Sequence, residues 1–402
     1  MKRTVLLATA GIALALGGCT FLKNIVGTKD NVEPPRKLTE LAPTIGIQTL
    51  WTERASKGAG DSGARMSPAV VDGRVYAAGV DGTITALDAQ SGNELWRVHA
   101  GKRTGSLLRL RRGENSLRWS GGPAVTGDLL VVGGLDGQVY AYSAVDGTPR
   151  WNTQMPSEVI TQPVISEGVV VVRTNDGRLT GLDAANGSRK WVFDQLVPPL
   201  SLRGNSAPLV ADGLVFSGLD NGRVVALKLA DGHQQWSQVV SVGEGRTDVE
   251  RLADVDGPVA LDGNDLYAAG YRGQLVALSV DRGQPQWQRD LSSYAGVAVA
   301  GDVLVVVDSE SNIWAFDRQT GANRWKQDAL QYRWLSAPAI QGNAVVVGDL
   351  DGYVHWLNLD DGKLAARERL GRDRIESAPV AAAGVVYVED VDGRIGAYRI
   401  GQ

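Results

Sequence analysis

The chain has 402 residues, of which 21% are charged, 50 are glycine and one is cysteine. Its 41 basic and 45 acidic residues give a formal net charge of −4, and this acidic balance excludes general nucleic-acid binding, which needs a basic surface. The single cysteine excludes a disulfide within one molecule.

Residues 1–18 have the pattern of a secretory signal, in which a positively charged start precedes an apolar run from Val5 to Leu16. That run is too short for a membrane-spanning helix, which needs about 20 apolar residues. Leu16, two glycines and Cys19 resemble the processing site of bacterial lipoproteins, in which the cysteine thiol is diacylglycerylated and the new amino terminus is acylated. We therefore predict lipidation of Cys19, which anchors a protein stably. An ordinary signal peptide with an incidental cysteine is the alternative.

The residues after the cysteine indicate to which membrane the protein is sorted and how long its tether is. Thr20 stands where an aspartate would retain a lipoprotein in the inner membrane, so the resemblance to enterobacterial sorting implies the outer membrane, with the protein facing the periplasm. Removal of residues 1–18 takes away two positive charges and changes the formal charge from −4 to −6. Residues 19–45 have mixed charge, a pair of prolines and no strand pattern, which predicts a tether of at most about 80–90 Å.

From residue 46 onward one pattern recurs eight times. The copy from Pro68 to Trp96 contains an alternating apolar run, an Asp-Gly pair, a second apolar run that ends Ala-Leu-Asp, and a tryptophan. Alternation with period two between such pairs is typical of short strands joined by tight hairpins. Strand-forming repeats of this length predict an all-β protein, an eight-bladed β-propeller of four-stranded antiparallel blades. The other copies begin at Pro123, Pro163, Pro208, Pro258, Val297, Pro338 and Pro379.

The ends of the chain are predicted to close the ring. The last copy, residues 379–400, stops after three strands and lacks a tryptophan, whereas residues 46–52 form a lone strand that ends at Trp51. Pairing the two removes an open sheet edge, so residues 46–402 are expected to form one propeller domain. The tryptophans are expected to pack between blades. Ala366 stands in place of the tryptophan in the seventh copy, which predicts a weaker seam there.

Few residues in the chain indicate chemistry. His99, His233 and His355 lie in different copies without a second ligand nearby in sequence, so we expect surface histidines and no metal site. The segments Asp349–Gly352 and Asp390–Gly393 resemble calcium loops, but their glycine comes fourth rather than sixth, so hairpin turns are predicted. No motif for catalysis or nucleotide binding occurs, which predicts a non-enzymatic protein without a cofactor. A catalytic site formed by residues of several blades at the central channel remains an alternative.

The strand that ends at each tryptophan has a recognisable form, as in Ala86–Trp96 and Ala315–Trp325. It resembles the repeat of pyrroloquinoline-quinone dehydrogenases, which are also eight-bladed and hold the quinone at the ring axis against calcium, commonly beside a vicinal disulfide. This chain has no cysteine for that disulfide. The repeat indicates the fold, and fold alone does not carry activity. A periplasmic quinoprotein dehydrogenase that uses the channel is therefore the alternative function, and a polysaccharide-binding propeller is a third.

Long connections between copies are candidates for function, because loops on a rigid ring commonly carry it. In a four-stranded blade these connections, residues 97–121, 192–206, 237–256 and 326–336, are predicted to emerge on one face. The first is basic and is expected either to contact lipid headgroups or an acidic partner, or simply to be solvated. Its basic residues are Lys102, Arg103, Arg109, Arg111, Arg112 and Arg118.

Two neighbouring loops hold the candidate partner-binding residues. Leu200, Leu202 and Arg203 combine apolar anchors with a forked cation, the composition of an interaction hot spot. Asp254 and Asp256 lie in the loop of the next blade, which is expected to present them outward beside Arg203. Two alternatives stay open: the leucines cap the blade core, and the acids form an internal salt bridge.

Together, the lipoprotein signal, the quinoprotein-like ring and the two loops resemble the BamB family, lipoproteins of the β-barrel assembly machinery. The resemblance covers the whole chain, and both loop motifs, residues 200–203 and 251–256, match. It implies a non-enzymatic scaffold that works with the other Bam lipoproteins and assists the insertion of unfolded outer-membrane proteins. It further implies that a POTRA domain of BamA binds a patch composed of Leu200, Leu202, Arg203, Asp254 and Asp256.

Overall fold

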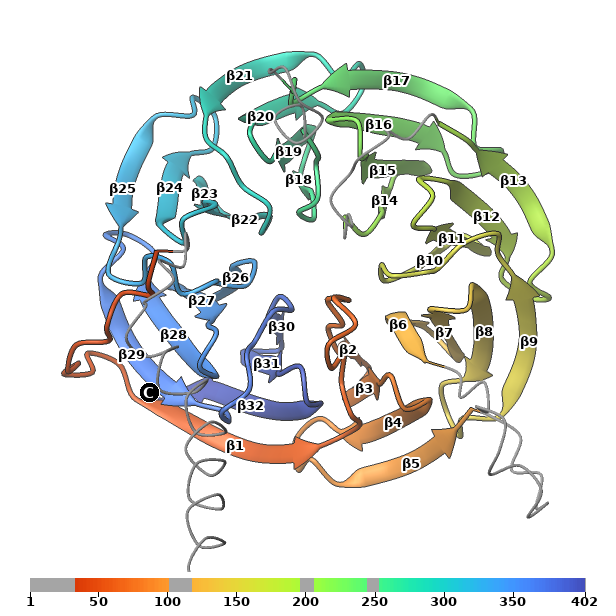
Figure 1. Cartoon of the computed structure of the whole chain (residues 1–402), viewed down its shortest axis with the longest axis horizontal. Helices are drawn as coiled ribbons and strands as arrows, with labels where there is room; N and C mark the ends of the chain where they lie inside the picture. Colours follow the sequence, from red (N-terminus) through yellow and green to blue (C-terminus); the bar gives the residue numbers. More distant parts are fainter. Residues whose placement is uncertain (1–32, 101–117, 196–205, 244–252, 402) are drawn as a thin grey trace, which may run out of the picture. The chain divides into compact units, whose positions relative to one another are not determined.

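The computed structural model describes residues 33–100, 118–195, 206–243 and 253–401. The chain divides into an amino-terminal unit, Met1–Pro35, and a second unit, Arg36–Gln402, which contains every described strand. The second unit is a ring of eight separate four-stranded sheets, as Figure 1 shows. Within the described ranges, no helix has the length and apolar character needed to cross a bilayer.

The first four blades follow one another along the chain. Blade 1 consists of β2 (Ala69–Val71), β3 (Arg74–Ala78), β4 (Thr83–Asp88) and β5 (Glu94–His99). Blade 2 consists of β6 (Trp119–Thr126), β7 (Leu129–Gly134), β8 (Gln138–Ser143) and β9 (Pro149–Gln154). Blade 3 consists of β10 (Val164–Ser166), β11 (Val169–Arg173), β12 (Leu179–Asp183) and β13 (Arg189–Phe193). Blade 4 consists of β14 (Leu209–Ala211), β15 (Leu214–Gly218), β16 (Arg223–Lys228) and β17 (Gln234–Val239).

The remaining blades continue around the ring. Blade 5 consists of β18 (Ala260–Asp262), β19 (Asp265–Ala269), β20 (Gln274–Ser279) and β21 (Pro285–Asp290). Blade 6 consists of β22 (Val297–Ala300), β23 (Val303–Val307), β24 (Ile313–Asp317) and β25 (Asn323–Gln327). Blade 7 consists of β26 (Ala339–Gln341), β27 (Ala344–Gly348), β28 (Tyr353–Asn358) and β29 (Leu364–Arg369). Blade 8 consists of β30 (Val380–Ala382), β31 (Val385–Glu389) and β32 (Arg394–Ile400), completed by β1 (Ile47–Arg54).

The two ends of the chain close the ring, which confirms the predicted fold. β1 pairs antiparallel with β32 from Ile47 opposite Ile400 to Arg54 opposite Arg394, with one irregularity between Thr49 and Trp51. In Figure 1, β1 lies on the outer rim beside β32, and the first strand of every blade faces the centre. The strand order β1-β32-β31-β30 therefore mixes the two termini in one sheet.

Tryptophans join successive blades through packing and a repeated hydrogen bond. Seven indoles each donate Nε1–H to a backbone carbonyl of the next blade, at 2.7 to 3.1 Å. Each indole also lies on a glycine of that blade, and at Gly232, whose φ is +72°, a Cβ would stand 2.6 Å from Trp191. The donors are Trp51, Trp96, Trp151, Trp191, Trp236, Trp287 and Trp325.

The seam between blades 7 and 8 is filled in a different way from the other seams. Trp356 of β28, opposite Ala366 in register, is fully buried and packs edge-on against Tyr398 of blade 8, with ring centroids 5.6 Å apart. Its Nε1–H donates to Gln341 at 2.8 Å, and the Gln341 amide donates to the Tyr398 carbonyl at 3.0 Å. The expected weak seam is therefore not a gap, because another tryptophan and a glutamine replace the missing indole.

Part of the segment assigned to the tether lies on the ring. The Thr44 N–H donates to the Ala365 carbonyl of β29 at 2.8 Å, and the Arg36 N–H donates to the Gln331 carbonyl at 3.0 Å. In Figure 1 this segment runs outside blade 7 before it enters β1. Residues 36–45 therefore belong structurally to the propeller unit and not to a free linker.

Candidate partner-binding site

The candidate residues divide between described and undescribed parts of the chain. Leu200, Leu202, Arg203 and the lipidation candidate Cys19 lie outside the described residues, as does most of the basic connection 97–121. The two acids are described: Asp254 is 1% exposed and Asp256 is 5% exposed. These acids are thus buried, whereas the sequence analysis expected them to be presented outward.

The ends of the two candidate loops meet on one hairpin of blade 4. The Ser206 hydroxyl, at the end of the first loop, accepts the Gly218 N–H at 3.3 Å. In the second loop, the Val255 N–H donates to the Leu219 carbonyl at 3.3 Å. A Cβ on Gly218 would stand 2.4 Å from the Val255 carbonyl oxygen, so this close approach requires glycine. The hairpin between β15 and β16 therefore fixes where both loops return to the ring.

Beneath this hairpin lies a buried ion pair that the sequence analysis missed. Arg173, at the end of β11, pairs with Asp220 of the hairpin, and their side chains are 2% and 7% exposed. The Arg173 guanidinium also donates to the Ser206 carbonyl at 3.2 Å. One buried cation of blade 3 thus holds blade 4 and the end of the first candidate loop together.

Alignment of the copies would have identified Arg173. In the strand register, its position is occupied by small or apolar residues in six other blades, and only Arg173 and Glu389 are charged there. A charge at a position that is otherwise Ala, Gly or Val indicates a partner close by, because an unpaired buried charge is costly. The six equivalents are Ala78, Gly133, Gly218, Ala269, Val307 and Gly348.

Asp256 is electrostatically coupled to this ion pair. Burial raises the pKa of Asp256 to about 6, although the positive charges of Arg173 and Arg65 oppose the shift and Asp220 adds to it. Its Oδ1 accepts no hydrogen bond from the described residues. Burial and this coupling favour an internal position for Asp256, at the junction of blades 3, 4 and 5, although the described residues form no salt bridge with it. A destabilised buried carboxylate also marks a candidate functional position.

Arg65 links this junction to the far side of the ring. It lies in the connection from blade 8 to blade 1, yet its guanidinium donates to the Tyr294 carbonyl, between blades 5 and 6, at 2.9 Å. The guanidinium carbon also lies 5.6 Å from the centroid of the Tyr294 ring, a cation–π contact. Because the two connections are three blades apart, Arg65 reaches across the ring on the face that bears the inter-blade connections.

The described residues offer little for metal chemistry. Among them, no group of three or more His, Cys, Asp or Glu side chains is placed to hold an ion. His99 and His233 are exposed as predicted, but His355 is fully buried, so its prediction as a surface residue was wrong. The segments 349–352 and 390–393 are hairpin turns, as predicted.

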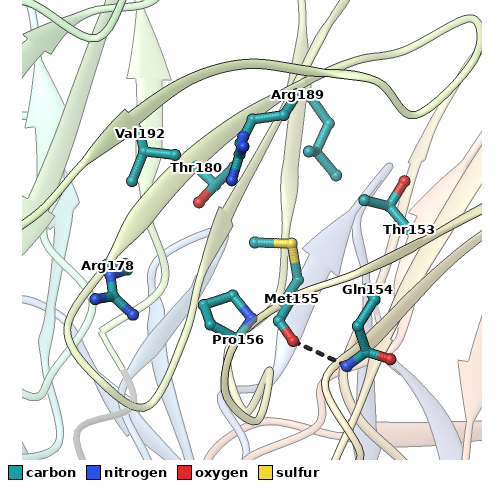
Figure 2. Close-up of a pocket in the computed structure, with 9 residues that line it drawn as sticks. Thr153, Gln154, Met155, Pro156, Arg178, Thr180, Arg189 and Val192 are labelled. Atoms are coloured by element: carbon teal, nitrogen blue, oxygen red, sulfur yellow. Dashed lines mark hydrogen bonds between the residues drawn. The ribbon is translucent and has the colours of Figure 1, made fainter.

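A surface groove of about 560 Å³ lies between blades 2 and 3 (Figure 2). Its lining combines apolar Met155, Leu182 and Val192 with Arg178 and Arg189. Arg178 is already paired with Asp176 at 2.5 Å and with Asp194 at 3.2 Å. The hydrogen bond to Asp194 is the largest of the causes that raise the pKa of Arg178. The groove borders β13, the strand that leads into the first candidate loop.

Comparisons with known proteins agree on one family. A family model described as "Outer membrane protein assembly factor BamB" matches residues 35–112 and 81–327. A relative of that name from Xanthomonas campestris pv. campestris is 41% identical over 405 residues, which covers 100% of this chain and 98% of the relative.

Solved structures show the same ring. The crystal structure of BamB from Moraxella catarrhalis has a TM-score of 0.78 and 26% identity, and the match covers 88% of this chain and 100% of that chain. A quinohemoprotein alcohol dehydrogenase from Comamonas testosteroni has a TM-score of 0.68 at 14% identity, covering 88% of this chain and 76% of that one, which shows a shared fold alone. The protein described here belongs to the BamB family of outer membrane protein assembly factors.

Proposed function

We propose that this protein is a non-enzymatic scaffold of the outer-membrane β-barrel assembly complex, held by lipid on Cys19 at the periplasmic side of the outer membrane. The observation that carries the proposal is 41% identity, along the whole chain, to a relative named as an outer membrane protein assembly factor. The lipoprotein-like segment that ends at Cys19 supports the anchor.

We further propose that a POTRA domain of BamA binds the patch composed of Leu200, Leu202, Arg203, Asp254 and Asp256, of which the two buried acids contribute by positioning the second loop rather than by direct contact. Support comes from the convergence of the two loop ends, since Ser206 and Val255 both contact the hairpin of blade 4 at Gly218 and Leu219. Residues displayed from one rigid junction bind with little loss of conformational entropy, which favours affinity.

In this proposal the ring organises its partners and performs no chemistry. The seven indole bonds and the closure by β1 make the blades one rigid support, on which BamA, the other Bam lipoproteins and unfolded clients assemble. A quinoprotein activity would instead require a cofactor site at the ring axis. Added quinone and calcium should therefore give neither a bound chromophore nor alcohol-dependent dye reduction.

The partner patch is tested by charge reversal. The double variant Leu200→Asp, Arg203→Glu should lose co-purification with BamA at least tenfold, because an apolar anchor and a bidentate cation are both removed. The matched control Val145→Asp, Lys363→Glu changes one exposed apolar residue and one exposed cation on blades 2 and 7. It should retain full recovery. Undiminished recovery of BamA by the folded double variant would remove the patch assignment.

A further inference from the structure

The amino-terminal segment of the ring is held at its start by a surface loop. Arg36 donates its N–H to the Gln331 carbonyl at 3.0 Å and its guanidinium to the Asp328 carbonyl at 2.8 Å. Its guanidinium also pairs with the Asp328 carboxylate at 3.0 Å. Both partners belong to the connection from blade 6 to blade 7, on the same face as the Asp254–Asp256 connection.

Two further arginines hold the backbone of the same segment. Arg333 donates to the Arg36 carbonyl at 3.1 Å, and Arg367 donates to the Thr39 carbonyl at 3.0 Å. Between these two points, Leu38 packs on the apolar cluster shared by blades 6 and 7. Together with the bond from Thr44 to β29, the contacts extend over residues 36–44, which we name the strap.

The two arginines are themselves fixed by a buried network. Arg333 Nε donates to Asp349 Oδ2 at 2.8 Å, and His355 Nε2 lies 2.9 Å from the same oxygen. Arg367 Nε donates to His355 Nδ1 at 3.3 Å. Since a guanidinium only donates, Nδ1 is the acceptor and Nε2–H donates to Asp349, so the imidazole is neutral. This agrees with the effect of burial, which lowers the pKa of His355.

The network gives both guanidinium groups a fixed orientation. The Nε–H of Arg333 donates to Asp349, and one terminal nitrogen donates to Asp351 at 2.5 Å. The other terminal nitrogen therefore points at the strap, where it donates to the Arg36 carbonyl. The Arg333 side chain is 4% exposed. A buried, rigidly held donor gains a backbone acceptor at little entropic cost, which distinguishes this arrangement from a mobile surface contact.

We propose that the network of Arg333, Asp349, His355 and Arg367 is a docking site for the strap, and that docking shortens the length of chain left between Cys19 and the ring. The anchor at Cys19 is part of the proposed function, and the docking itself does not depend on it. With the strap docked, the chain from Cys19 to Pro35 spans at most about 60 Å when fully extended, about 30 Å less than the chain from Cys19 to residue 45.

Amide hydrogen exchange of the full-length lipoprotein in detergent micelles tests the docking. The Arg36 and Thr44 amides donate hydrogen bonds to the ring, so both should exchange slowly in the unmodified protein. The variant Arg333→Gln, Arg367→Gln should raise their exchange rates at least tenfold and leave the amides of β27 and β28 unchanged. The control Arg324→Gln removes a cation of β25 that pairs with Asp302 and Asp317, and should leave the strap protected.

A milder variant covers the case in which loss of buried Arg333 unfolds blade 7. Arg36→Glu, Arg367→Gln breaks the contact to Asp328 and the bond to Thr39, and spares the core of the network. Spin labels at Lys37→Cys and Lys363→Cys should then change from a narrow to a broad distance distribution. Fast exchange at Arg36 and Thr44 in the unmodified protein, or a distance distribution left unchanged by the milder variant, would overturn the proposal. Neither measurement involves BamA, so failure of the partner proposal would be seen separately.

Discussion

At the scale of single residues, the buried carboxylate of Asp256 lowers the free energy of unfolding at neutral pH, and this effect can be measured. Its pKa is raised from 3.8 to about 6 by burial, so the folded state binds its proton more tightly than the unfolded state does. Its contribution to stability is therefore full below about pH 4 and is lost as the pH rises to about 6. A shift of that size corresponds to about 3 kcal/mol.

We accordingly expect Asp256→Asn to raise the free energy of unfolding at pH 7.5 by about 1–3 kcal/mol. The gain should disappear below about pH 3, where the carboxyl is protonated in both states. Urea unfolding at the two pH values measures this. As a contrast, Asp220→Asn leaves the Arg173 cation without its buried partner and should destabilise by about 3 kcal/mol or more. A destabilised Asp256→Asn protein at pH 7.5 would contradict the assignment.

The candidate site could be predicted only in part from the sequence. Asp254 and Asp256 were identified from their place in the loop next to Arg203 and from the family resemblance, but neither shows what packs above that loop, so outward presentation was expected. Arg173 and Asp220 come from different blades, and their pairing depends on how neighbouring sheets stack. Such contacts between blades have no local signal apart from the unusual charge at a small-residue position.

At the scale of elements, each seam between blades depends on its indole. Trp191 is 7% exposed, packs on Gly232 and donates to the Leu229 carbonyl at 2.8 Å. Trp191→Ala should therefore lower the free energy of unfolding by about 3–5 kcal/mol. Trp334→Ala is the matched control, since that indole is 57% exposed, and its effect should stay within about 0.5 kcal/mol. Equal losses in the two variants, measured by chemical denaturation, would refute the role of the seam indole.

The strands and turns were the most predictable part of the fold. Period-two apolar runs and Asp-Gly pairs follow directly from the alternation of side chains and the turn geometry of a hairpin. The seam at blade 7 was not predictable, because Trp356 stands on β28 and replaces the indole expected at Ala366 on β29. The two residues face each other across the sheet, a relation that appears only once the strands are paired.

At the scale of the whole molecule, the missing fourth strand of the last copy predicted the closure of the ring. The strap was not predicted, because residues 36–44 have no strand period and interact largely through their backbone. Their acceptors are carbonyl groups, which every residue has, and their donors, Arg333 and Arg367, lie about 300 residues away. Sequence patterns show the periodicity of side chains and do not predict such contacts between backbone carbonyls and distant residues.

Because β1 closes the ring, a chain without this strand should be less stable and should associate. Deletion of residues 36–54 removes Trp51, with its bond to the Ala89 carbonyl, and exposes the edge of β32. Loss of a buried tryptophan costs about 3–5 kcal/mol, and at about 2–4 °C per kcal/mol the unfolding temperature should fall by about 6–20 °C. The exposed edge should also promote association through strand pairing. Deletion of residues 20–35 is the control and should change neither the unfolding temperature nor the sedimentation coefficient of the monomer. If both deletions behaved alike, the chain would not need its amino-terminal strand to complete the ring, because the stability of blade 8 would then come from β30, β31 and β32 alone.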